Sequence, residues 1–291
     1  MNLLTLAVLV LAAAYGPPST RVFTLAANEN INVTRYEGGA KTPIVIVPGL
    51  LGSAYGFRQI APQLAEQGHP VIIVDMLGAG SSSKPHKADY SLTAQSRRIE
   101  TVLDSLGIRD AIVVAQALGG SISYRLAVHR PDLVKAIVGI DAGASEQAAT
   151  SGVRKAMKFA TVIRIFGAKR IMVGKVKEGL IDASADPAWV TPEIVREYTA
   201  PYREDAGQML KVMQTMANTK EPELLVPLLP NLKAHVLLLV GTSEKALSAE
   251  KIEVLRAGLP NFTLRRVEGA GQFVNEERPD AVLEAILEIS R

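Results

Sequence analysis

The sequence contains no cysteine, which excludes disulfides, thiolate nucleophiles, zinc–thiolate sites and a lipidated N-terminal cysteine. Histidine is scarce, with four residues in a chain of 291. Neither sign of charge is in large excess, because the formal net charge is only +3, and no nucleic-acid-binding motif accompanies it. We therefore expect no nucleic-acid partner, and we expect neither a metal nor a cofactor. No feature of the sequence indicates an oligomeric state.

Long hydrophobic runs are also lacking. The longest, Leu3 to Ala14, is too short to span a bilayer. It has the size of the apolar core of a signal peptide, and Ala12-Ala13-Ala14 resembles a cleavage site, although the usual positive charges before the core are missing. We favour an export signal within an N-terminal extension, residues 1–20, which predicts a secreted or periplasmic protein. The alternative is an N-terminal helix of a cytoplasmic protein.

Short apolar runs alternate with amphipathic stretches along most of the chain, which predicts an α/β fold with a mostly parallel sheet and helices on both faces. An opening antiparallel pair is expected first, at Arg21–Leu25 and Ile31–Tyr36. Further strands are predicted at Ile44–Val47, Val71–Asp75, Ala111–Ala115, Ala136–Ile140, Val236–Val240 and Thr263–Val267. Helices are predicted at Phe57–Glu66, Thr93–Leu106, Gly119–His129 and Pro279–Ile289.

Residues 145–228 interrupt this alternation with a helical pattern, so they are predicted to form a lid inserted into a core of residues 21–144 and 229–291. The lid is basic near its start, since Gly152 to Lys177 holds eight basic residues and no acidic one. We interpret this run as a solvated outer helix face. Contact with an anionic membrane surface is the less favoured alternative.

Five segments, in this order and spacing, resemble motifs of the α/β-hydrolase superfamily, especially its capped ester, epoxide and carbon–carbon bond hydrolases. They are Pro48-Gly49-Leu50-Leu51-Gly52, Asp75-Met76-Leu77-Gly78-Ala79-Gly80-Ser81-Ser82, Ala115-Gln116-Ala117-Leu118-Gly119-Gly120, Gly241-Thr242-Ser243-Glu244 and Gly269-Ala270-Gly271-Gln272-Phe273. The resemblance implies the α/β-hydrolase fold. It also implies that Ala117, Glu244 and Gln272 occupy the positions of the family's serine, acid and histidine.

These three residues predict that triad hydrolysis is absent. Ala117 has no lone pair with which to attack a carbonyl carbon. Gln272 does not titrate near neutral pH, so it cannot shuttle a proton. Without an imidazole to orient, Glu244 loses its role in the triad and is expected to hydrogen-bond Gln272 instead. Of other candidates, His86 is the least implausible substitute base, and Asp141 is expected to be structural.

The resemblance implies that the backbone amides of Leu50 and Leu118 still converge above Ala117, at the start of a helix, because they need no particular side chain. We therefore predict a site for a small, largely apolar ligand with a carbonyl or carboxylate, lined also by Gln272 and Gln116. Two alternatives stay open. One is an enzyme of lyase or isomerase type that uses Glu244 as a base. The other is a carboxylester-type hydrolase that has been inactivated.

Overall fold

The structure is a computed structural model that describes residues 16–26, 28–50, 52–149, 151–157, 168–203 and 205–291. Within these ranges one sheet of eight strands has the order β1-β2-β4-β3-β5-β6-β7-β8. The strands are β1 (Ser19–Ala26), β2 (Glu29–Tyr36), β3 (Ile44–Val47), β4 (Val71–Val74), β5 (Ala111–Gln116), β6 (Val134–Ile140), β7 (His235–Gly241) and β8 (Phe262–Val267). The pairs β1–β2 and β2–β4 are antiparallel, and all other neighbouring pairs are parallel.

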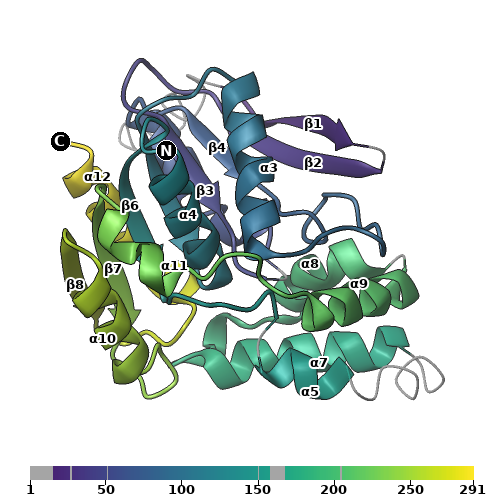
Figure 1. Ribbon diagram of the computed structural model, residues 1–291. Helices are drawn as coiled ribbons and strands as arrows, with labels where there is room; N and C mark the ends of the chain where they lie inside the picture. The colour runs from purple at the N-terminus through teal and green to yellow at the C-terminus, as the bar shows by residue number, and fades with distance from the viewer. Residues whose placement is uncertain (1–15, 27, 51, 150, 158–167, 204) are drawn as a thin grey trace.

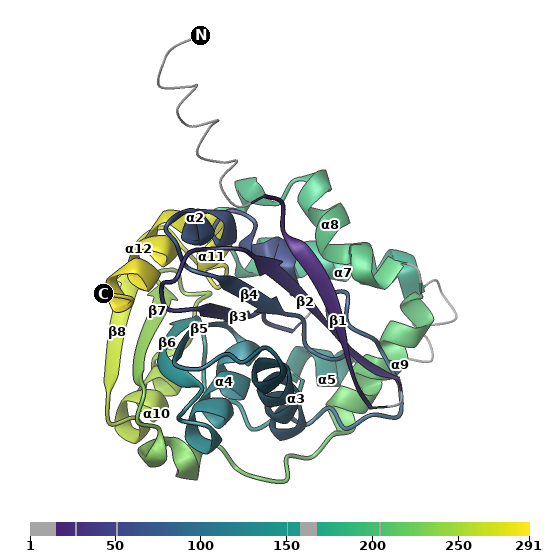
Figure 2. The same cartoon turned by 90° about the horizontal axis from the view of Figure 1, so that it is seen from above.

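Helices cover both faces of this sheet, as Figure 2 shows. Side chains alternate along each strand, so Val45 and Val47 of β3 pack into one apolar cluster, while Ile44 and Ile46 pack into the other. The first face is covered by α3 (Leu92–Ser105), α4 (Leu118–His129) and α10 (Ala249–Gly258). The second is covered by α2 (Ala61–Glu66) and α12 (Pro279–Ile289), with the short η1 (Ala54–Phe57) and α11 (Val274–Glu277) beside them.

A helical insertion lies between the end of β6 at Ile140 and the start of β7 at His235. It contains α5 (Ser151–Met157), α7 (Ala168–Ala183), η2 (Pro187–Trp189), α8 (Pro192–Arg203), α9 (Ala206–Asn218) and η3 (Val226–Asn231). The insertion's α-helices gather together below the sheet in Figure 1. The insertion follows the carboxyl end of β6, and parallel strands end at a common edge. It therefore lies at the sheet edge where β3, β5 and β7 also end.

The predicted strands are confirmed with ends shifted by a few residues, and the final helix has the predicted bounds. The predicted helix at Phe57–Glu66 is instead split into η1 and α2. Two helices, α10 and α11, are not predicted from the sequence. The apolar run at residues 3–14 lies outside the described residues. Within the described ranges, no helix is both long enough and apolar enough to cross a membrane.

Part of the basic run of the insertion lies on α7. On α7, Lys169, Arg170, Lys175 and Lys177 are exposed. Lys175 pairs with Glu178 one helical turn later. Two further residues of the basic run, Lys158 and Arg164, lie outside the described residues. The exposure of these four side chains fits the solvated helix face expected for the run, which stays a prediction.

Candidate functional site

Ala117 occupies a strained turn, the elbow, between β5 and α4. Its backbone angles are φ 46° and ψ −114°, which a non-glycine residue rarely adopts. The turn is held by two backbone hydrogen bonds, from Ala117 N to Ile140 O at 2.9 Å and from Gly120 N to Ala117 O at 3.0 Å. The residue is exposed, so this sharp bend lifts a methyl group away from the buried strand.

Two positions packed against this turn require glycine. A Cβ atom on Gly119 would lie 2.4 Å from the carbonyl oxygen of Val47, and one on Gly120 would lie 2.4 Å from Cβ of Ala142. On the other side of the turn, a Cβ on Gly49 would approach Cβ of Ala117 to 3.3 Å. The close fit explains how the chain keeps the strained conformation without a catalytic side chain at its apex.

Two backbone amides lie beside this turn without an acceptor. Leu118 is the first residue of α4, so its N–H has no partner within the helix. Neither Leu118 N nor Leu50 N donates a hydrogen bond to any described residue. The two residues line the same small cavity, whereas the convergence of their amides above Ala117 stays a prediction. Unpaired N–H groups at a helix N-terminus favour a carbonyl oxygen or an anion.

The cavity that Leu50 and Leu118 share is apolar and narrow. Its volume is about 10 Å³, which is room for about one water molecule. Two of its lining residues are polar, but the Tyr90 hydroxyl already donates to Pro85 O and the Gln95 amide donates to Leu77 O. The remaining lining is aliphatic or sulfur-containing: Leu50, Met76, Leu77, Ala79, Leu92, Leu118, Ile122, Ala148 and Met216.

The loop that forms one wall of this cavity is fixed by Asp75. The buried carboxylate accepts hydrogen bonds from Ser81 N at 2.8 Å, Ala54 N at 3.1 Å and Asn32 Nδ2 at 3.2 Å. A Cβ on Gly80 would lie 2.3 Å from the Asp75 carboxylate, so this loop requires glycine there. Burial raises the pKa of Asp75, and the three hydrogen bonds oppose that effect.

Glu244 and Gln272 do not form the predicted hydrogen bond. Both side chains are exposed, and no hydrogen bond joins them. Gln272 is instead held through its backbone, because its N–H donates to Ala183 O at the end of α7 at 2.9 Å. Gly271 fits beneath the same carbonyl, where a Cβ would come within 2.3 Å of the oxygen. The loop that carries Gln272 is therefore positioned by the helical insertion rather than by Glu244.

Comparisons with known proteins agree with this geometry. A family model described as the alpha/beta hydrolase fold matches residues 42–161. An uncharacterized hydrolase of Bacillus subtilis (strain 168) is 26% identical over 264 residues, which cover 88% of this chain and 93% of the relative. The magnesium-chelatase 30 kDa subunit of Rhodobacter capsulatus is 26% identical over 263 residues, covering 86% of this chain and 88% of that protein.

Solved structures of hydrolases match the fold over nearly the whole chain. The 2-hydroxy-6-oxo-6-phenylhexa-2,4-dienoate hydrolase of Rhodococcus sp. matches with a TM-score of 0.76 at 17% identity, covering 94% of this chain and 98% of that one. An epoxide hydrolase matches with a TM-score of 0.75 at 20% identity, covering 94% and 98%. The chain belongs to the α/β-hydrolase superfamily. The fold expected from the five motifs is therefore confirmed.

Gln116, which is predicted to line the ligand site, is not among the residues that line the apolar cavity beside Leu118. Its side chain is buried, and its amide nitrogen donates to Asn275 Oδ1 at 2.8 Å. The Asn275 amide in turn donates to Gly56 O at 2.8 Å. Gln116 therefore ties β5 to α11 and, through Asn275, to η1.

The aromatic residues near Gln272 hold the insertion against the hydrolase core. Tyr198 of α8 donates to the buried carboxylate of Glu276 at 2.6 Å, and Arg58 pairs with the same carboxylate at 2.7 Å. Trp189 packs against Tyr198 and against Phe273, with ring centroids 6.2 and 5.5 Å apart. These contacts fix the insertion on the side where the Gln272 loop lies.

Asp141 is a buried carboxyl between the ends of β5 and β7. It follows β6 in a left-handed conformation, with φ 49°, and accepts a hydrogen bond from Leu247 N at 2.6 Å. Burial raises the pKa of Asp141 to about 7, an effect that the Leu247 bond and the charges of Lys251 and Arg266 oppose. The bond to the loop after β7 agrees with the structural role expected from the sequence.

None of the four histidines is hydrogen-bonded to the elbow. His69 bonds the carbonyl of Thr42, His129 bonds Glu223, and His235 bonds Thr263. His86 is exposed on its loop. No group of three or more histidine, aspartate or glutamate side chains suitable for a metal ion occurs among the described residues.

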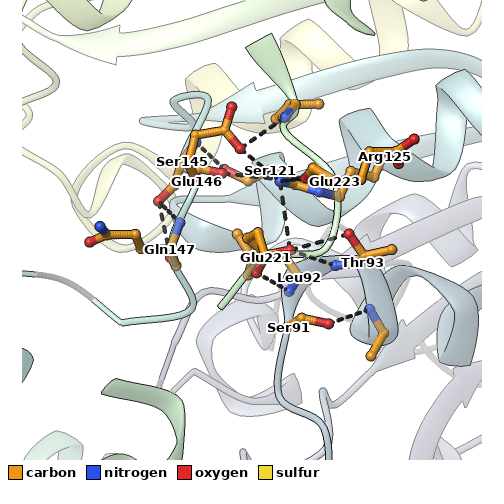
Figure 3. Close-up of polar contacts among 12 residues, drawn as sticks. Ser91, Leu92, Thr93, Ser121, Arg125, Ser145, Glu146, Gln147, Glu221 and Glu223 are labelled. Atoms are coloured by element: carbon orange, nitrogen blue, oxygen red, sulfur yellow. Dashed lines mark hydrogen bonds and ion pairs between the residues drawn. The ribbon is translucent and has the colours of Figure 1, made fainter. Parts of the chain in front are cut away.

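A buried arginine joins the two ends of the insertion to the hydrolase core. Arg125 of α4 is fully buried and pairs with Glu146 at 3.0 Å and with Glu221 at 3.8 Å, as Figure 3 shows. Glu221 accepts the N–H of Leu92 at the start of α3, and Glu146 accepts the N–H of Leu225 before η3. Sequence reasoning missed this network because its members are far apart along the chain.

This network borders an open cleft of about 450 Å³ at the base of the insertion. Polar and charged residues make up much of its wall, in contrast to the apolar cavity beside Leu118. The cleft is lined by Glu146, Gln147, Ala149, Arg154, Met216, Ala217, Asn218, Thr219, Lys220, Glu221 and Leu224. Met216 lines both spaces.

Proposed function

We propose that this α/β-hydrolase-family protein is a pseudo-hydrolase that binds a small, largely apolar ligand through a carboxylate or carbonyl group. The observation that supports this most strongly is a strained elbow with a methyl group at its apex, next to two amides that have no acceptor among the described residues. Binding of an oxygen needs only the amides. Covalent catalysis needs a nucleophile, which Ala117 does not supply.

The proposed ligand places its oxygen atoms at Leu50 N and Leu118 N. The positive end of α4, a helix of 12 residues, adds to the attraction for a negative charge at this place. The rest of the ligand meets an apolar surface, since the cavity next to these amides has aliphatic walls. A carboxylate with a hydrocarbon chain satisfies both requirements. A cation lacks the oxygen acceptor, and a sugar lacks the apolar surface.

The alternative of lyase-type or isomerase-type chemistry has weaker support. A catalytic base must be held in one position against the substrate. The Glu244 side chain is exposed and makes no hydrogen bond within the described part of the chain. A binding role does not depend on how Glu244 is held. The matching hydrolases among the relatives are consistent with an enzyme ancestor.

A calorimetric titration tests the binding proposal directly. Hexanoate is expected to bind, and hexanol, which has the same chain but no carboxylate, is expected to bind at least about tenfold more weakly. The variant Ala117→Asp places a negative charge beside the amides and is expected to weaken hexanoate binding by at least about tenfold. Ala117→Asn is the matched neutral control, because it brings similar bulk without charge.

Two outcomes would contradict the proposal. One is equal affinity for hexanoate and hexanol, together with equal effects of the two Ala117 variants. The other is turnover of short p-nitrophenyl esters by the native chain. If Ala117→Ser alone gave full esterase activity, the protein would instead be an inactivated carboxylester hydrolase.

A further inference from the structure

We propose that the open cleft at the base of the insertion is a second binding site, which takes a small organic phosphomonoester through Arg154 and Lys220. The cleft has a volume of about 450 Å³. Small-molecule sites usually have volumes of about 300 to 1,000 Å³, so the cleft is large enough for such a ligand. The site is independent of the proposed function, because neither Leu50 nor Leu118 lines this cleft.

Two cations line the cleft without a carboxylate partner in the described part of the chain. Arg154 belongs to α5, and Lys220 follows the end of α9, a helix that packs against α5. Neither side chain forms an ion pair with a described residue. One guanidinium nitrogen of Arg154 donates to Ala149 O at 2.9 Å. This bond holds the guanidinium in place and leaves its other N–H groups for a ligand.

The carboxylates of the cleft wall do not cancel these two charges, because the hydrolase core already uses them. Glu146 pairs with Arg125 at 3.0 Å and accepts two backbone N–H groups at the start of η3. Glu221 accepts two backbone N–H groups at the start of α3 and is also near Arg125, as Figure 3 shows. Arg125 therefore offsets part of the negative charge, and Arg154 and Lys220 are left to attract an anion.

A phosphomonoester matches Arg154 and Lys220 in charge and in geometry. Near neutral pH it carries a charge of about −1.5 to −2, which is close to the two positive charges of these side chains. A guanidinium binds two phosphate oxygens side by side, while an ammonium group acts as a point charge on another oxygen. A monocarboxylate, with its single charge, would leave one of the two cations without a partner.

The rest of the wall fits an organic group attached to the phosphate. Leu224 lines the cleft with 59% of its surface exposed, and Ala149 and Ala217 add further apolar surface. The side-chain amides of Gln147 and Asn218 line the same cleft and form no hydrogen bond with a described residue. An organic group can cover the apolar side chains and hydrogen-bond these amides. Inorganic phosphate offers no such contacts, so it is expected to bind more weakly.

Calorimetric titration with phenyl phosphate tests this site. Phenyl phosphate is expected to bind. Inorganic phosphate and benzyl alcohol each supply only one half of the ligand, so they are expected to bind at least about tenfold more weakly. Arg154→Gln and Lys220→Gln are each expected to weaken the binding of phenyl phosphate by at least about tenfold. Arg154→Lys is expected to cause a smaller loss, because it keeps the charge but not the paired donors.

Lys155→Gln and Lys211→Gln are the matched controls. Lys155 follows Arg154 on α5, and Lys211 lies on α9 ahead of Lys220. Both are exposed, and neither lines the cleft. Each control removes one positive charge from the same helical region, and the affinity for phenyl phosphate is expected to change by less than about twofold.

The amide site beside Ala117 also favours anions, so Ala117→Asp is measured with the same ligand. It is expected to leave phenyl phosphate binding unchanged, because the elbow lies outside the cleft. If Ala117→Asp abolished the binding, phenyl phosphate would bind at the elbow and the cleft proposal would be wrong.

Three other results would overturn the proposal. One is the absence of phenyl phosphate binding to the native chain. Another is an equal loss of affinity in the cleft variants and in the lysine controls, which would indicate a general effect of net charge. The last is binding to phosphatidate-containing vesicles without binding of phenyl phosphate, which would indicate a membrane-facing surface. The hexanoate titration measures the proposed carboxylate site separately, so failure at one site does not decide the other.

Discussion

Replacement of Asp141 by asparagine is expected to stabilise the protein at alkaline pH and to have little effect near pH 4. Asparagine has the same shape, can accept the Leu247 N–H bond and tolerates the left-handed backbone at φ 49°. The substitution therefore removes the titration of a buried carboxyl with little change in packing.

The magnitude follows from the raised pKa of Asp141, about 7 in the folded protein against 3.8 for an ordinary aspartate. The folded state keeps its proton up to about pH 7, whereas the unfolded state loses it near pH 4. Stability therefore falls as the pH rises through this window. The loss reaches about 4 kcal/mol at pH 8, since one unit of pKa difference corresponds to about 1.4 kcal/mol. The Asp141→Asn variant does not lose this stability, because asparagine does not titrate.

Urea unfolding followed by circular dichroism at several values between about pH 4 and pH 8 measures the effect. The matched control is Asp110→Asn, because Asp110 also has a left-handed backbone, φ 50°, but is exposed. The stability difference between Asp141→Asn and the native chain is expected to grow with pH, and that of the control to stay constant. The reasoning is refuted if Asp141→Asn gains no stability between the two ends of the range.

Three further substitutions test the packing of the hydrolase core and of the insertion. Gly119→Ala is expected to destabilise the protein by about 2 kcal/mol or more in urea unfolding, because its Cβ would lie 2.4 Å from Val47 O. Gly174→Ala, a helical position with no atom within 4 Å of the added Cβ, is expected to stabilise by up to about 1 kcal/mol. Arg125→Met is expected to cost about 3 kcal/mol and to speed proteolysis of the insertion, because it leaves Glu221 buried without its cation. Equal stability of the two glycine variants, or unchanged proteolysis of the arginine variant, would contradict these expectations.

Much of the sheet is predictable from local sequence. Strands such as Ile44–Val47 and Ala111–Gln116 are buried over their whole length, so they appear as continuous apolar runs between turns. The final helix starts at Pro279 and has a clear apolar stripe, and its bounds are correct. By contrast, α10 was missed because Ile252 and Leu255 are its only buried residues, which leaves almost no amphipathic pattern.

The candidate site is predictable only in part. The order of small residues around Ala117 indicates the elbow, because the steric need for glycine is local. The partners of Gln116 and Gln272 are Asn275 and Ala183, which lie far away in sequence, and local patterns hold no information about them. The expected bond from Gln272 to Glu244 was wrong for this reason, since the insertion rather than the acid holds that loop.

The most direct test of the proposed binding site is a nuclear magnetic resonance titration of leucine-¹⁵N-labelled protein with hexanoate. The amide resonances of Leu50 and Leu118 are expected to show the largest shifts, saturating together at one dissociation constant, while hexanol leaves them in place. If hexanoate binds but shifts other leucine amides and leaves these two unchanged, the ligand does not bind above Ala117 and the account is wrong.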